Sequence, residues 1–142
     1  MTQTAEELFA TGLDRYQAGE DAATLLPLFK EVCDKAPKNS AAWTCLAWLQ
    51  LLAGDNAKAV KSAQRAVKLN PQDPQARVNL AIALLDSGKA GVREHVDIAS
   101  RIAFFSQELR EDLVTSFEDG LQRNPEWSAL IRVKAWVLGE EG

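Results

Sequence analysis

The stretch that decides the fold is residues 40–73, "SAAWTCLAWLQLLAGDNAKAVKSAQRAVKLNPQD". Two kinds of marker recur along this part of the chain at the same spacing. The interval from Pro37 to Pro71 equals the interval between the turn glycines Gly54 and Gly88. A fixed period of about 20 to 50 residues is typical of stacked supersecondary units, each of which buries its apolar face against its neighbours. The sequence therefore predicts a repeat architecture.

The spacing of apolar and small residues inside this stretch resembles the tetratricopeptide repeat, a helix-turn-helix of about 34 residues with the pattern W-x2-L-G-x2-Y…A-x3-F…P. Ala47 replaces the small glycine of that pattern, whereas Gln50 and Ala63 replace its two aromatic residues. The residues that match in type and spacing are Trp43, Leu46, Ala59, Ala66 and Pro71. Small residues let two helices approach closely, and the large ones fill the space between them.

The resemblance covers about the first 100 residues and implies an all-α fold. We expect one domain, residues 1–142, built as a right-handed superhelical solenoid of antiparallel helix pairs. It has about three repeats and a variant C-terminal helical cap. The expected repeats are residues 5–39, 40–73 and 74–105, and the cap is residues 106–139. The helices are predicted near residues 4–18, 22–36, 41–53, 56–69, 74–87, 91–104, 107–123 and 126–138.

Composition argues against several classes of partner. The chain has 16 Lys and Arg against 20 Asp and Glu, a net charge of −4, which is the wrong sign for a dedicated nucleic-acid-binding protein. One stretch carries positive residues within a narrow helical sector, which we interpret as a solvated face, a nucleic-acid adaptor being a distant alternative. These residues are Lys58, Lys61, Arg65 and Lys68.

No segment indicates a membrane span or a secretory leader. The N-terminus lacks a basic region followed by an apolar run, and no window approaches about 18 consecutive apolar residues. We therefore expect no membrane insertion and a cytoplasmic protein. Cys33 and Cys45 lie in apolar helical surroundings and are predicted to be buried thiols.

Nothing in the sequence indicates catalysis. His95 is the single histidine, and neither cysteine has metal-ligand spacing. Adjacent acids such as Glu118 and Asp119 point about 100° apart on a helix and are interpreted as solubilising charge. No phosphate-binding loop or nucleophile elbow occurs. We expect no enzyme activity, no cofactor and no metal site.

The two tryptophans at positions 43 and 48 have different predicted roles, because five residues carry a helix about 140° round. Trp43 occupies a packing position, and the resemblance implies that Trp48 faces a concave groove. The predicted groove residues are Phe9, Leu13, Thr44, Trp48, Leu52, Val78, Asn79, Ile82 and Leu85. Truncation of Trp48 to Ala is expected to weaken partner binding and to leave the fold intact.

This lining predicts a protein-interaction adaptor that binds an apolar peptide or helix of a partner. It argues against the carboxylate tails of heat-shock chaperones, since Thr44, Cys45 and Trp48 fill positions where that clamp needs Lys or Asn. Two alternatives stay open: a C-terminal helix covers the groove, or the protein is a homodimer or assembly scaffold. The last helix carries Trp127 and Trp136 on opposite sides. It therefore inserts into the domain, forms an oligomer contact or continues into a longer chain.

Overall fold

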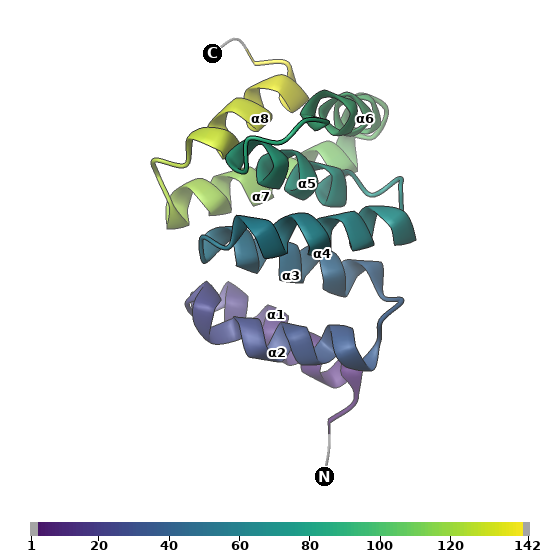
Figure 1. The fold of residues 1–142 in the computed structure, drawn as a ribbon, viewed down its shortest axis with the longest axis vertical. Helices are drawn as coiled ribbons and strands as arrows, with labels where there is room; N and C mark the ends of the chain where they lie inside the picture. Colours follow the sequence, from purple (N-terminus) through teal and green to yellow (C-terminus); the bar gives the residue numbers. More distant parts are fainter. Residues whose placement is uncertain (1–2, 141–142) are drawn as a thin grey trace.

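The computed structural model describes residues 3–140, and all regular structure within this range is helical (Figure 1). The eight predicted helices of these residues are confirmed to within about two residues at each end. Their bounds are α1 Ala5–Gln17, α2 Ala22–Lys35, α3 Ser40–Leu52, α4 Asn56–Leu69, α5 Pro74–Asp86, α6 Val92–Phe105, α7 Gln107–Arg123 and α8 Ser128–Leu138.

Polar residues begin the central helices where a cap is needed. Asp55 and Asp73 accept backbone hydrogen bonds at the starts of α4 and α5, which satisfies amides that lack a helical partner. Asn39 caps α3 in the same way, since its side chain accepts from the amide of Ala42. Asn124 ends α7, and α8 begins only at Ser128, two residues later than the predicted start at residue 126.

The turn glycines of the repeat have the same role. Gly54 and Gly88 have φ angles of 83° and 66°, a left-handed conformation that glycine adopts without a side-chain clash. Each glycine ends the first helix of a unit and lets the second helix fold back beside it. The period thus follows from backbone geometry as well as from packing.

The helices pack in sequence order, α1 through α6, each against the next. Small residues at the contacts are completely buried, as the pattern predicts: Ala47, Ala59, Ala63 and Ala66 have no exposed surface. Trp43 is half-buried, and its indole N–H donates to the carbonyl oxygen of Pro37 at 2.9 Å. Trp43 therefore has the packing role that its position predicts.

The last two helices fold back onto the repeats. α8 packs against α5 and α6, while α7 contacts α5, α6 and α8 (Figure 1). One apolar cluster spans α3 to α8, and a second, smaller one joins α1, α2 and α3. The C-terminal helices are thus part of the main core, and the surface they cover contains the candidate site.

Candidate functional site

Trp48 on α3 lies where the repeats meet the C-terminal helices. Only 9% of its surface is exposed, and its ring lies 5.5 Å from that of Trp127 with the planes 42° apart. Its indole N–H donates to the hydroxyl of Tyr16 at 2.8 Å. The chain's own C-terminal part therefore covers Trp48, and because the indole is a core side chain we expect Trp48→Ala to destabilise the domain rather than leave the fold intact.

Gly120 lets α7 approach Trp48 closely. A Cβ atom at this position would lie 2.9 Å from a ring carbon of Trp48 and 2.6 Å from Cδ1 of Leu130. Both distances are shorter than a normal carbon contact, so only glycine fits without movement of its neighbours. Gly120 thus determines how near α7 lies to the concave side of α3.

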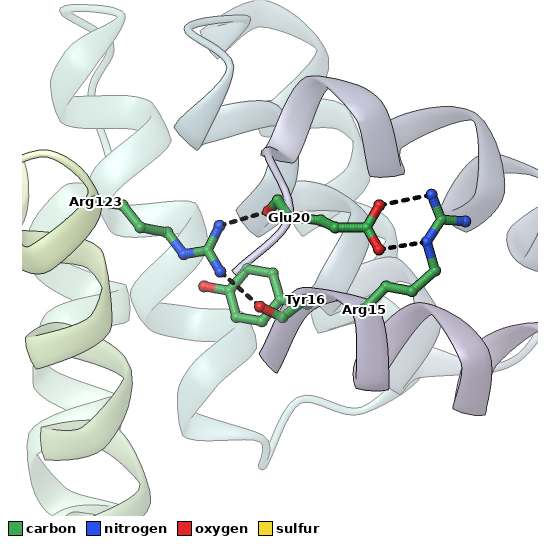
Figure 2. A network of polar contacts seen from close by, with 4 residues as sticks. All are labelled: Arg15, Tyr16, Glu20 and Arg123. Carbon is green, nitrogen blue, oxygen red and sulfur yellow. Dashed lines mark hydrogen bonds and ion pairs between the residues drawn. The ribbon is translucent and has the colours of Figure 1, made fainter. Parts of the chain in front are cut away.

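A set of polar residues ties α7 to the first helix pair, and we call Tyr16, Glu20, Asp119 and Arg123 the polar clasp. Arg123 donates to the main-chain carbonyl oxygens of Tyr16 at 2.7 Å and of Glu20 at 3.0 Å (Figure 2). Its guanidinium lies 3.9 Å from the centre of the Tyr16 ring and 3.4 Å from the Asp119 carboxylate. The Tyr16 hydroxyl donates to Asp119. The charges of Asp119 and Arg123 are therefore paired within the clasp, while the Glu20 carboxylate accepts from Arg15 (Figure 2).

The clasp keeps Tyr16 protonated. Burial raises the pKa of the Tyr16 phenol above its ordinary value, and the hydrogen bond to the Asp119 carboxylate raises it further. The indole N–H of Trp48 and the charge of Arg123 act in the opposite direction. Tyr16 thus serves as a hydrogen-bond donor to α7 and an acceptor from α3 at the same time.

An open cleft of about 650 Å³ remains beside the clasp, between α1, α3, α5 and α7. Its only charged residues, Asp119 and Arg123, are paired with each other, and its other residues are apolar or carry amides and hydroxyls. The lining comprises Leu13, Tyr16, Gln17, Gly19, Phe29, Thr44, Cys45, Trp48, Leu49, Gln75, Asn79, Thr115, Ser116, Asp119, Gln122 and Arg123. Such a surface suits a ligand that is mainly apolar and uncharged.

The structure brings four of the predicted groove residues to this cleft: Leu13, Thr44, Trp48 and Asn79. Asn79 is fully buried, donates to the main-chain oxygen of Thr44 at 2.9 Å and accepts from Gln75 at 2.8 Å. Its side chain therefore holds α5 to α3 and shapes the floor of the cleft.

The other predicted groove residues lie elsewhere. Val78 and Ile82 are completely buried in the core, so the prediction that they line an open groove is corrected, because the C-terminal helices join that core on α5. Phe9 is half-buried and packs edge-on against Phe29 with ring centres 6.0 Å apart. Leu52 and Leu85 are half-buried against the main core.

The two tryptophans predicted as oligomer contacts lie on opposite sides of the C-terminal segment, as their spacing predicts. Trp127 is buried, and its indole N–H donates to the Asp86 carboxylate at 3.1 Å. Trp136 is 45% exposed. Trp127 therefore belongs to the core, and only Trp136 is available to a second copy.

Most of the clasp joins residues that are distant in sequence and carry no recognisable motif. Asp119 was expected to be solubilising charge, and this is wrong, since its carboxylate accepts from Tyr16 and contacts Arg123. Its neighbour Glu118 is exposed as expected. Tyr16 and Arg123 are 107 residues apart, and no local spacing signals a contact over that distance.

The remaining titratable groups have structural surroundings. His95 Nδ1 lies 3.0 Å from an Arg77 guanidinium nitrogen, and burial and that positive charge lower the pKa of His95. Burial raises the pKa of Cys33 and of Cys45 to about 12, so both remain thiols at neutral pH. Within residues 3–140, no group of three or more His, Cys, Asp or Glu side chains is placed to hold a metal ion.

None of the helices in the described range combines the length and apolar character that a bilayer span requires.

Comparison with known proteins places these features in a structural context. Residues 40–83 match the family model described as tetratricopeptide repeat. The translocator chaperone SycD of type III secretion from Yersinia enterocolitica, in a structure described as an alternative dimer, is similar over 100% of this chain and 98% of its own. The TM-score is 0.70 and the sequence identity 20%.

The tetratricopeptide-repeat domain of Sgt2 from Aspergillus fumigatus is similar over 94% of this chain and 76% of its own, with a TM-score of 0.56 and 17% identity. A sequence comparison with curated proteins gave no match. Because the sequence identities to both structural neighbours are low, these likenesses demonstrate the shared helical-repeat fold alone.

Proposed function

We propose that this chain, whose residues 40–83 match the tetratricopeptide-repeat model, is a protein-interaction module whose cleft binds an apolar, extended segment of a partner protein. The observation that carries the proposal is the character of the cleft. Its volume of about 650 Å³ is within the range of ligand sites, and its two charged residues are already paired. A charged partner segment would lose water there without gaining a counter-ion.

The polar groups of the cleft suit a peptide main chain. Gln75, Thr115, Ser116 and Gln122 supply neutral amides and hydroxyls along its walls. Such groups orient an extended peptide by hydrogen bonds, while the apolar floor accepts its side chains. The same character disfavours the carboxylate tails of heat-shock chaperones, because the single cation of the lining, Arg123, is bonded to Asp119 and to main-chain oxygens. One of the structural neighbours is itself named a translocator chaperone.

Selection from a library of random short peptides tests this proposal. We expect enrichment of peptides rich in apolar residues and poor in charge. Leu13→Arg and Ser116→Arg place a charge on opposite walls of the cleft. Each should weaken the binding of the selected peptides by about tenfold or more. Trp48→Ala is not a suitable test, because it removes a core side chain.

The matched control is Thr24→Arg, which introduces the same side chain on the exposed surface of α2, outside the cleft. It should leave affinity unchanged. Peptides that bind the two cleft variants as tightly as the wild type would place the interaction elsewhere and refute the proposal.

A second candidate function, self-association, is favoured by where apolar surface is exposed. Apart from Leu13, the exposed large apolar side chains of residues 3–140 all belong to α6 and α8, which pack against each other. They are Phe104, Phe105, Ile131 and Trp136. Phe104 and Phe105 are 81% and 79% exposed. Two adjacent phenylalanine rings in contact with water are unfavourable for a monomer, so their exposure favours burial against a second copy.

Sedimentation of the wild type and of a variant with both phenylalanines changed to Ser distinguishes the two functions. A dimer that becomes a monomer in the variant supports self-association through α6. A wild type that stays monomeric at high micromolar concentration excludes it and leaves the cleft as the interaction site.

A further inference from the structure

Phe104 and Phe105, which we call the Phe pair, form an apolar protrusion at the end of α6. Both side chains are exposed, and their rings pack edge-on with centres 5.1 Å apart and planes 87° apart. The backbone after them is hydrogen-bonded on both sides, because the amide of Ser106 donates to the carbonyl oxygen of Ile102 and the Ser106 hydroxyl accepts from the amide of Leu109. The two rings are therefore held as one unit at the corner between α6 and α7.

The Phe pair lies in an uncharged segment. Residues 102–107 are Ile-Ala-Phe-Phe-Ser-Gln, and the nearest charged residues in the sequence are Arg101 and Glu108. An exposed apolar group is buried most favourably against a surface that also lacks free charge, because no charged group then loses its water. The segment around the pair thus favours an apolar, uncharged site.

The cleft between α1, α3, α5 and α7 is such a site. Its Asp119 and Arg123 are paired with each other, and Leu13 on its wall is exposed. Its volume of about 650 Å³ is within the range of sites that hold drug-sized molecules, which are larger than two phenyl rings. The cleft and the protrusion therefore match in polarity, and the cleft has room for the Phe pair.

The Phe pair does not reach the cleft of its own chain. Neither ring lines the cleft, and α6 lies at the far end of the molecule from α1, which forms one cleft wall (Figure 1). A contact between the two features thus needs a second copy of the chain.

Two modes of self-association differ in the area that they bury. A phenylalanine side chain buries about 150–250 Å², so Phe pairs packed on each other bury about 800 Å² in total, the size of a crystal contact. When each pair instead enters the cleft of the other copy, the cleft walls are buried as well, and two such contacts bury about 1,600 Å². This is the size of a stable protein interface, and the twofold repetition closes the assembly at a dimer.

We propose that two copies of the chain form a reciprocal dimer, in which the Phe pair of each copy occupies the cleft of the other. The inference rests on the proposed function of the cleft as a site for apolar groups, and it adds a regulation of that site. Self-association and partner binding are mutually exclusive. The dimer is thus a closed state, and an apolar partner segment opens it by displacing the Phe pair.

Sedimentation of variants tests the two sides of the contact. Phe104→Ser with Phe105→Ser removes the protrusion, and Leu13→Arg or Ser116→Arg places a charge in the cleft; all four residues are exposed or half-exposed, so the variants should fold. The wild type should sediment as a dimer at high micromolar concentration, and each of the three variant chains should raise the dissociation constant by about tenfold or more. The matched control is Ile131→Ser, which removes an exposed apolar side chain of α8 and should leave the dimer unchanged.

A mixing experiment decides between the reciprocal dimer and the packing of Phe pairs on each other. The double serine variant keeps an intact cleft, and Ser116→Arg keeps an intact Phe pair, so a mixture of the two should form a heterodimer. It should be weaker than the wild-type dimer, because only one of the two contacts is restored. As a control, a chain that carries the two serine substitutions and Ser116→Arg together should associate with neither variant.

The regulation is tested with the apolar peptides selected on the cleft. A saturating peptide should convert the wild-type dimer into monomers with one peptide each. The double serine variant should bind the peptide more tightly than the wild type does, by a factor that grows with protein concentration, because its cleft is free. A peptide that binds in the cleft of an intact dimer overturns the inference and leaves the proposed function standing, whereas peptides insensitive to the cleft variants refute the proposed function. The mixing experiment needs no peptide, so it decides the inference in either case.

Four further results would overturn the inference. The first two are a wild type that stays monomeric at high micromolar concentration and a mixture of the two variants that contains no heterodimer. The third is a dimer that survives Leu13→Arg and Ser116→Arg but not the loss of the Phe pair, which identifies packing of the Phe pairs on each other. The fourth is a dimer that is lost in Ile131→Ser, which places the contact on α8.

Discussion

Arg123 donates a hydrogen bond of 2.7 Å to the main-chain carbonyl oxygen of Tyr16, a residue 107 positions earlier in the chain. This bond joins α7 to the end of α1, although the two helices do not pack along their lengths. The connection between the first repeat and the C-terminal helices therefore depends on a few side chains, and it sets the width of the cleft between them.

The first prediction concerns this connection. Arg123→Gln should lower the free energy of unfolding by about 3 kcal/mol or more, since each hydrogen bond to a charged group contributes about 1.5–3 kcal/mol and the variant loses two of them. The urea midpoint measures the change. Arg101→Gln, an exposed residue of α6, is the control and should be nearly neutral. An equal midpoint for Arg123→Gln and the wild type would show that the clasp does not stabilise the domain.

The second prediction uses the single tyrosine of the chain. The pKa of Tyr16 is raised in the folded protein, so its contribution to stability is complete below the ordinary tyrosine pKa of about 10 and is lost progressively as the pH rises above it. Ultraviolet absorbance of the phenolate reports this residue alone. The folded protein should show little phenolate at about pH 10, whereas the protein unfolded in guanidinium should be half ionised there.

Asp119→Asn separates the two causes of that shift. It removes the negative charge beside the phenol and leaves its burial, so the pKa of Tyr16 should fall toward the ordinary value without reaching it. A phenolate signal near pH 10 from the folded wild type would mean that Tyr16 is exposed to water and that the clasp is open in solution.

The repeats could be predicted from the sequence because their contacts are local and periodic. The period holds even at a position where the residue type changes. Arg77 lies one repeat period after Trp43 and occupies the equivalent position of the next unit. Arg77 donates to the carbonyl oxygen of Pro71 at 3.0 Å, and Trp43 donates to that of Pro37 at 2.9 Å. A guanidinium thus makes the same bond as an indole, so the period persists although the residue type changes.

The cover over the groove could not be predicted in the same way. It depends on contacts between residues that are distant in sequence and belong to different helices, and these carry no period. Trp48 shows the consequence: its position on α3 is predicted correctly, but its neighbours Gly120 and Leu130 come from helices outside the repeat. The sequence is compatible with a C-terminal helix that covers the groove, but it does not indicate which part is covered. Only the placement of α7 and α8 identifies the part of the groove that stays open.

The third prediction concerns the close approach of α7. Gly120→Ala should destabilise the protein by about 1 kcal/mol, because the new Cβ would clash with Leu130 and Trp48. Overpacking of this kind costs about 1–3 kcal/mol, and the higher helix propensity of alanine recovers about 1 kcal/mol of that. Ser116→Ala, one turn earlier on α7 and half-exposed, changes helix propensity without a clash and should be neutral or slightly stabilising. A stabilised Gly120→Ala variant would show that α7 lies farther from α3.

The last prediction concerns Gln50, whose amide oxygen is buried without a hydrogen-bond partner in residues 3–140. Gln50→Leu should raise the free energy of unfolding by about 1 kcal/mol or more, because a buried unpaired acceptor costs about 1–3 kcal/mol and leucine fills a similar volume without a polar atom. Urea unfolding measures the gain, with the exposed Gln64→Leu as the control that should change little. Loss of stability in Gln50→Leu would mean that the amide oxygen accepts a hydrogen bond in solution.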